Sequence, residues 1–387
     1  MWQARFFWNG RTNNDLNTES GDTDKLIHWL KLKSVPGVGN LLFKRLLERF
    51  KSPEAVFEAA HPSLIRVDGI SSRLAVLISE YKISDDVKRE ADLIREKGCR
   101  IITLTDEQYP TLLREIPDPP PILYVMGNLE SSVQHIAIVG SRTPTRYGIF
   151  TAKRLSEDLA KLNITVVSGM ARGIDTAAHI GALSGGGKTV AVLGSGLEKV
   201  YPVENLKLFH RIIENGAVIS EFSLNSPPDP YHFPARNRII SGMSLGTVIV
   251  EAAQKSGSLI TARLAAEQGR EVFAVPGSIH SFKSMGTHSL IKQGAKLVEH
   301  AQDILEELFP QNPIQRKTVT HKQLPPLSSE ETTVLNALSP YPIHIDDLLR
   351  KIEMDAGKLS GILLQLELKD LVQQSPGKLF STEYKTD

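Results

Sequence analysis

The chain has 387 residues, of which 41% are hydrophobic, so it can bury at least one large core and is not intrinsically disordered. Its 45 basic and 44 acidic side chains nearly cancel. This balance excludes nucleic-acid binding through bulk charge and requires a local basic patch instead.

Features that report on compartment point to a cytoplasmic protein. The single cysteine, Cys99, excludes an internal disulfide and fits a reducing environment. Residues 1–9 lack the apolar core of a signal peptide, and no run is long enough to span a bilayer. We therefore expect no membrane contact.

Five segments follow one another along the chain. After a tail at residues 1–22, helix-period apolar positions and glycine turns predict a small helical domain over residues 23–98. Apolar strands alternate with helical segments over residues 99–310 and predict an α/β fold, an extended Rossmann-like parallel sheet. Residues 311–327 lack periodicity and predict a linker, and residues 328–387 predict a winged-helix-like domain.

Two turns of the helical segment resemble helix-hairpin-helix turns, whose amides can meet a DNA phosphate. They are Val35–Gly39 and Val67–Ile70. Few basic residues flank them, namely Lys44, Arg45 and Arg73. We therefore favour turns that pack short helices, with auxiliary DNA contact as the alternative.

Two strands of the predicted sheet break directly into turns that carry glycine and arginine. The turn residues are Gly140, Ser141 and Arg142 after the strand His135–Val139, and Ser168, Gly169 and Arg172 after the strand Thr165–Val167. The carboxyl ends of parallel strands open onto the ligand crevice of such sheets. Glycine admits backbone amides to an anion, and arginine offers a planar fork to phosphate, so we predict a phosphate pocket centred on Arg142.

A third strand, Val190–Leu193, runs into Gly194-Ser195-Gly196. This pair of glycines lacks the third glycine of a dinucleotide fingerprint, and no acidic residue ends the preceding strand. The sequence therefore disfavours a nicotinamide site, and we predict no cofactor.

Taken in order, these motifs resemble the DNA-processing protein A family, also called DprA or Smf. The matching blocks are Gly140-Ser141-Arg142, Ser168-Gly169 with Gly173-Ile174-Asp175, Val192–Gly196 with Tyr201-Pro202, Phe233-Pro234 with Arg236–Ile240, Ser256–Ala262, and Val275-Pro276-Gly277. The resemblance implies a protein without catalytic activity. It would bind single-stranded DNA, protect it and load the RecA recombinase in natural transformation and recombination.

The predicted DNA-binding residues combine this resemblance with the strand-end pattern. They are Gly140, Ser141, Arg142, Ser168, Gly169, Arg172, Lys207, Arg236, Asn237, Arg238, Ser256, Gly257 and Ser258. A stacking ring would complement such phosphate contacts. Phe233 is the nearest candidate, although we favour it as a core residue.

Structural interpretations compete with several of these assignments. Arg172, Arg236 and Arg238 can each instead be tied to a carboxylate such as Asp175, Glu221 or Glu251, because buried arginines are usually paired. Asp175 and His179 share a helix face without a third ligand at a suggestive spacing. We therefore predict a helix cap and a hydrogen-bonded histidine there, and no metal site.

An enzymatic alternative rests on Gly242–Thr247 followed by Glu251, which is similar to the glycine-rich motif of the nucleoside-monophosphate phosphoribohydrolases. A glutamate and an arginine would serve a ribosyl transfer there. The chain lacks the proline and the paired glycines that begin this motif. We therefore prefer a binding protein with no catalytic residues.

Two further segments predict protein contacts. The resemblance implies a homodimer formed through Met285–Ala295, with His288, Leu290 and Ile291 as contacts, and recombinase docking on the same surface. In the tail, the helix Asp355–Lys369 is mostly apolar, whereas duplex reading requires polar or basic side chains that face outward. We favour a protein contact or self-association there, with duplex binding second.

Overall fold

The computed structural model describes residues 19–130, 134–310, 326–339, 342–369 and 371–382. Most of the predicted tail and linker lies outside these ranges. None of the helices in the described ranges combines the length and the apolar character that a membrane crossing needs. The chain divides into two compact units, Met1–Val133 with Val190–Met243 and Gln134–Thr189 with Ser244–Asp387.

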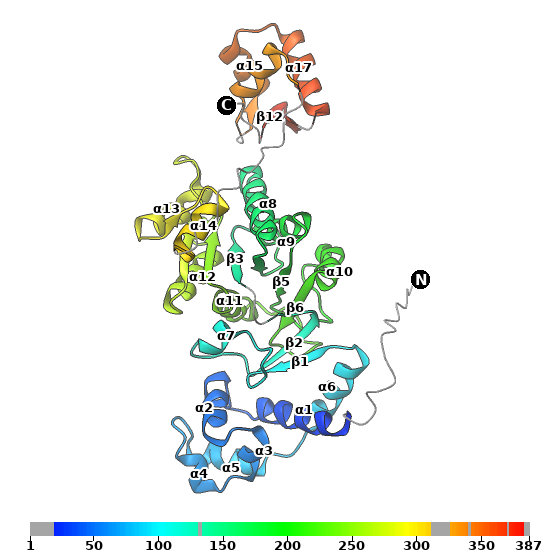
Figure 1. The fold of residues 1–387 in the computed structure, drawn as a ribbon, viewed down its shortest axis with the longest axis vertical. Helices are drawn as coiled ribbons and strands as arrows, with labels where there is room; N and C mark the ends of the chain where they lie inside the picture. The colour runs from blue at the N-terminus through cyan, green and yellow to red at the C-terminus, as the bar shows by residue number, and fades with distance from the viewer. Residues whose placement is uncertain (1–18, 131–133, 311–325, 340–341, 370, 383–387) are drawn as a thin grey trace. The chain divides into compact units, whose positions relative to one another are not determined.

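Every element that precedes the first strand is helical, as predicted. These helices are α1 (Glu19–Ser34), α2 (Asn40–Phe50), α3 (Pro53–Glu58), α4 (His61–Ile65), α5 (Ser72–Glu80) and α6 (Asp85–Glu96), in blue in Figure 1. Serine hydroxyls cap three of them, because Ser52, Ser71 and Ser84 each accept a bond from a backbone amide three residues on. Trp29 stacks on Phe43 in their core, with ring centroids 5.4 Å apart.

The two predicted hairpin turns share one geometry, in which the central glycine has φ of +90° in the first turn and +89° in the second. Two of the three basic side chains on α2 are bound to other parts of the protein. Lys44 donates to the carbonyl of Ile116 at 3.1 Å, and Arg45 pairs with Asp68 at 2.8 Å. These contacts favour the packing interpretation of the turns.

The central strands form a nine-stranded sheet in the order β1-β2-β6-β5-β4-β3-β7-β8-β9. The strands are β1 (Arg100–Thr103), β2 (Ile122–Gly127), β3 (His135–Val139), β4 (Thr165–Ser168), β5 (Thr189–Val192), β6 (Gly216–Ser220), β7 (Gly246–Ile249), β8 (Glu271–Ala274) and β9 (Lys296–Leu297). β3, β4 and β7 are buried along their whole length, the pattern of a parallel sheet covered on both faces. The Rossmann-like core is confirmed.

The sheet differs from the prediction at one edge. The pairs β3–β4, β3–β7, β7–β8 and β8–β9 are parallel, whereas β1–β2 and β2–β6 are antiparallel. Antiparallel strands require no helical crossover, so β2 follows β1 through a connection that contains only one short helix, α7 (Thr111–Glu115). Apolar pattern alone does not distinguish the two directions.

The remaining helices of the central region connect these strands. They are α8 (Arg146–Lys161), α9 (Ile174–Ser184), α10 (Leu206–Glu214), α11 (His232–Gly242), α12 (Gly257–Glu267), α13 (Met285–Lys292) and α14 (Ala301–Leu308), with 3₁₀ turns η1 (Val203–Asn205) and η2 (Phe282–Ser284). α8 and α9 pack backbone against backbone, because a Cβ at Gly181 would lie 2.3 Å from the carbonyl oxygen of Lys153.

The C-terminal region is a winged helix with its own core, as predicted. It contains α15 (Ser329–Ala337), β10 (Ile343–His344), α16 (Ile345–Ile352), α17 (Ala356–Leu368), β11 (Gln373–Ser375) and β12 (Leu379–Ser381). Lys358 and Lys369, near the two ends of α17, pair with Glu330 and Glu331. Leu364 and Leu368 are exposed on α17, a surface that agrees with the favoured protein contact, which stays a prediction.

We predict that the Cys99 thiol is inert in the folded protein. Burial raises its pKa to about 12, so the reactive thiolate is scarce at pH 8. Ellman's reagent should label the native protein slowly and the urea-unfolded protein promptly. A rapid stoichiometric reaction of the native protein at pH 8, absent from Cys99→Ser, would contradict this environment.

Candidate nucleic-acid interface

The loop after β3 presents Arg142 to solvent. Ser141 stabilises the turn twice, because its hydroxyl accepts from the amide of Thr143 at 3.2 Å and its carbonyl accepts from the amide of Ile174 at 3.1 Å. A Cβ at Gly140 would lie 2.8 Å from the Ile174 side chain. The loop is therefore fixed from below, while the Arg142 side chain is exposed.

The loop after β4 presents Arg172 and packs directly against the first loop. Gly173 has φ of +83°, and a Cβ there would lie 2.4 Å from the carbonyl oxygen of Ser141 and 2.9 Å from the carbonyl carbon of Arg142. Only glycine permits this approach. The structure thus brings the exposed Arg142 and Arg172 onto adjoining loops.

A third cation, which the sequence prediction missed, reaches the same loops. Lys283 in η2 donates to the backbone carbonyl of Thr143. Nothing near Lys283 in the sequence resembles a phosphate motif, so only its long-range contact reveals its position. We call Arg142, Arg172 and Lys283 the cationic rim.

Other predicted residues of these loops have structural roles. Ser168 and Gly169 are buried, and the Ser168 hydroxyl donates to the Ile138 carbonyl at 2.6 Å. Ser256 caps α12 by accepting from the Ser258 amide at 3.3 Å, and the Ser258 side chain is buried. Gly257 alone of this group is exposed.

The amino terminus of α8 is already occupied by a carboxylate of the protein. Glu251 lies directly after β7, is buried, and accepts from both the amide and the hydroxyl of Thr145, at 2.9 Å for the amide. Gly148 leaves room for this carboxylate, because a Cβ there would lie 2.7 Å from its carbon. The helix dipole therefore stabilises Glu251, and the phosphate pocket at Gly140, Ser141 and Arg142 stays a prediction.

His179 is hydrogen-bonded as predicted, whereas the N-cap residue of α9 is Gly173 and not the predicted Asp175. Asp175, in the first turn of α9, accepts from the amide of Ala171 at 3.3 Å. The Thr189 hydroxyl donates to the Val166 carbonyl, so it accepts the proton of His179 Nδ1 across 2.7 Å. The histidine is a hydrogen-bonded core residue.

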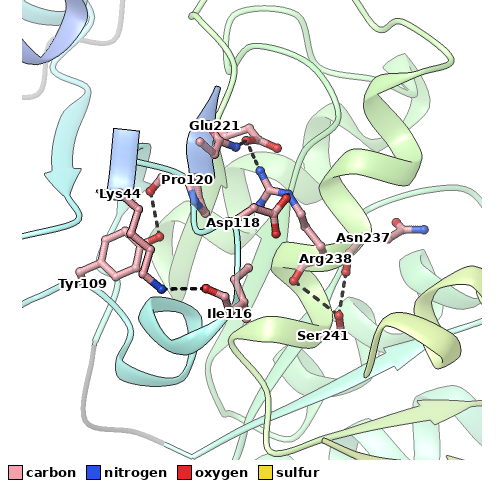
Figure 2. A network of polar contacts seen from close by, with 10 residues as sticks. Lys44, Tyr109, Ile116, Asp118, Pro120, Glu221, Asn237, Arg238 and Ser241 are labelled. Carbon is pink, nitrogen blue, oxygen red and sulfur yellow. Dashed lines mark hydrogen bonds and ion pairs between the residues drawn. The ribbon is translucent and has the colours of Figure 1, made fainter. Parts of the chain in front are cut away.

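The other two predicted arginines lie in the first unit, on α11, and both are buried. Arg236 donates to the Val192 carbonyl at 2.6 Å. Arg238 pairs with Glu221 at 2.5 Å and with Asp118 at 3.0 Å, as Figure 2 shows. The prediction that they contact phosphate is corrected, because their guanidinium groups face the interior.

Glu221 joins Arg238 to the helical region. Its carboxylate also accepts from Asn40 on α2 at 3.1 Å, and its carbonyl accepts from Lys33 on α1. Burial lowers the pKa of Lys33 to about 8, while the nearby carboxylates of Glu221 and Glu90 oppose that shift. Arg238 therefore acts as a structural hub for this unit.

Asn237 and Lys207 remain outside this hub. Asn237 lies between the two buried arginines, and its side chain points away from the Arg238 pairs in Figure 2. Lys207, at the second position of α10, is exposed. Both therefore stay predicted DNA contacts.

The fold and site define a Rossmann-like protein with a winged-helix appendage. The family model of the DNA recombination-mediator protein A matches residues 100–309, and that of the DprA winged helix domain matches residues 319–378. The chain belongs to the DNA recombination-mediator protein A family.

Its similarity to known relatives extends over most of the chain. Protein Smf of Synechocystis is 34% identical over 90% of this chain and 97% of its own length. The X-ray structure of DNA processing protein A from Streptococcus pneumoniae matches with a TM-score of 0.63 and 36% identity, over 73% of this chain and 96% of that one. A structure of the Helicobacter pylori protein, solved to study its single-stranded DNA binding mode, matches with a TM-score of 0.50 and 31% identity, over 55% and 96% of the two chains.

We predict that Arg238→Ala lowers the free energy of unfolding by about 3–5 kcal/mol, the cost of leaving a buried carboxylate without its partner. Arg172→Ala removes an exposed arginine and should change stability by about 0.5 kcal/mol or less. Urea unfolding followed by circular dichroism measures both. Equal effects of the two substitutions would show that Arg238 is not the hub.

Proposed function

We propose that this protein binds single-stranded DNA in the cytoplasm without catalysis, protects it, and loads the RecA recombinase onto it in natural transformation and recombination. The observation that carries the proposal is the cationic rim. Arg142 and Arg172 lie on loops at the carboxyl ends of the adjacent parallel strands β3 and β4, and Lys283 of η2 donates to the first of these loops. The single-stranded DNA binding named for the Helicobacter pylori relative supports the choice of ligand.

The chemistry of the rim suits a polynucleotide backbone. Arginine forks and a lysine ammonium bind phosphate oxygens without reading bases, which is the requirement of a protein that accepts any sequence. Because the chain carries nearly balanced charge, only such a local cluster attracts DNA. Lys207, Asn237 and Gly257 are further contacts in this proposal.

The enzymatic alternative loses its central group. A catalytic glutamate must face a substrate, whereas Glu251 is buried and bonded to Thr145. The arginine that would assist it, Arg238, is bound to Glu221 and Asp118. These contacts favour binding over ribosyl transfer.

The partner surface follows from the family resemblance and from exposed apolar side chains. Ile279 and Phe282 are 80% and 66% exposed, and both lie just before the predicted contact segment. His288 supports this loop with a 3.1 Å bond to the Gly277 carbonyl, while Leu290 and Ile291 are half-buried. We propose that this surface pairs two copies of the chain and docks the recombinase.

We predict that Arg142→Ala weakens binding to oligothymidylate and makes its salt dependence shallower, by about 0.7 in the slope of log affinity against log salt for each lost phosphate contact. Fluorescence anisotropy across a salt series measures the slope. Arg263→Ala, which removes an exposed arginine paired with Glu267, is the matched control. Unchanged affinity and slope for Arg142→Ala would remove the rim from the proposal.

We predict that Ile279→Asp converts a homodimer into a monomer, because a charge at the centre of an apolar contact is left unpaired. Sedimentation equilibrium at micromolar concentration measures the mass. Leu41→Asp, at an exposed leucine on α2, should leave the dimer intact. A monomeric wild-type protein would contradict the pairing.

A further inference from the structure

Two loops within one unit are joined by backbone hydrogen bonds. They follow β5 and β6, and they run from Leu193 to Pro202 and from Glu221 to Tyr231. The amide of Gly196 donates to the Ser226 carbonyl at 2.9 Å, and the amide of Glu198 donates to the Leu224 carbonyl at 3.0 Å. The two loops therefore form one fixed surface.

Each loop ends in an exposed tyrosine. Tyr201 is 44% exposed and Tyr231 is 86% exposed. The backbone at Tyr231 is nevertheless held, because its amide donates to Asp229 Oδ1 at 2.8 Å and the next amide donates to the Asp229 carbonyl at 3.0 Å. A ring that is open to water on an ordered turn has a face available for stacking.

The half-buried ring of Phe233 supports Tyr201. A Cβ at Gly194 would lie 2.9 Å from the Phe233 ring, so this ring packs against the backbone of the first loop. The Tyr201 ring leans on Phe233 with centroids 5.8 Å apart at 52°. This contact orients one face of Tyr201 without covering the ring.

The charges around the tyrosines suit a polyanion. Lys199 and Lys207 are exposed on either side of Tyr201 in the sequence. Three carboxylates lie near the tyrosines in the sequence: Glu198 pairs with Lys97 at 3.0 Å, Asp229 accepts from the Tyr231 amide, and Glu204 is exposed. Apolar rings beside lysines favour a ligand that combines planar bases with phosphates.

We propose that Tyr201 and Tyr231 form a stacking platform for unpaired nucleotide bases. The inference rests on the proposed function and adds to it the element that recognises bases. Every base offers a π face, so the platform accepts any sequence but requires the bases to be unpaired. It thereby selects single strands over duplexes, which phosphate contacts alone do not.

The test compares oligothymidylate with an abasic oligomer of the same length and charge, by fluorescence anisotropy at fixed salt. Tyr231→Ala should lower affinity for oligothymidylate about tenfold, within the range for loss of one base–aromatic stack, and leave affinity for the abasic oligomer unchanged. Tyr201→Ala should show the same selectivity. Tyr231→Phe should retain wild-type affinity, and Tyr231→Leu should not.

The controls separate this inference from the proposed function. Arg142→Ala should weaken binding of both oligomers and lower the salt slope, whereas the tyrosine variants keep the slope. The platform alone would be overturned if Tyr231→Ala and Tyr201→Ala bound oligothymidylate with wild-type affinity. It would also be overturned if Tyr231→Leu kept the full wild-type affinity for oligothymidylate. Failure of the wild-type protein to bind either oligomer would instead overturn the proposed function.

Discussion

The buried pair between Arg238 and Glu221 organises its unit. It joins α11 to the residue that follows β6, and Asp118 brings the connector before β2 to the same guanidinium. Asn40 and Lys33 attach the helical region to Glu221. A buried charge is tolerated only with its partners in place, so α11 and the loop beside it have one arrangement. The position of Tyr231, at the start of α11, depends on that arrangement.

A second internal carboxylate shapes the other unit. Glu251 occupies the amino terminus of α8, the position where many nucleotide-binding proteins hold a phosphate. In our proposal, phosphates are therefore bound by side chains of the cationic rim and not by backbone amides at the start of α8. Several cationic side chains suit a polymer with many phosphates, whereas an amide pocket suits one fixed phosphate. Glu251 also belongs to the motif that is similar to that of the phosphoribohydrolases. Because it is buried against α8, this motif has no exposed glutamate for catalysis.

In our proposals, phosphate contacts and base contacts come from different loops. The rim supplies charge, which gives affinity for any nucleic acid and is weakened by salt. Tyr201 and Tyr231 supply apolar faces, which respond to whether bases are unpaired. Neither contribution reads sequence. A protein that must accept any incoming strand and then release it to a recombinase needs this combination of general affinity and selectivity for single strands.

The sequence by itself determined the elements with strong local patterns. The bounds of β3 match those predicted, because an apolar run that ends in a glycine is a local property of the chain. The sequence also determined the family. The family motifs include glycines such as Gly140 and Gly173, where neighbouring atoms leave no room for a Cβ. Only the tertiary structure decided which arginines reach solvent. Arg142 and Arg238 both lie in motifs that predict DNA contact. Arg238 meets Glu221 and Asp118, carboxylates from other segments, while Lys283 reaches the Thr143 carbonyl beside Arg142 from 140 residues away. Long-range pairing of this kind leaves no periodic trace in the sequence.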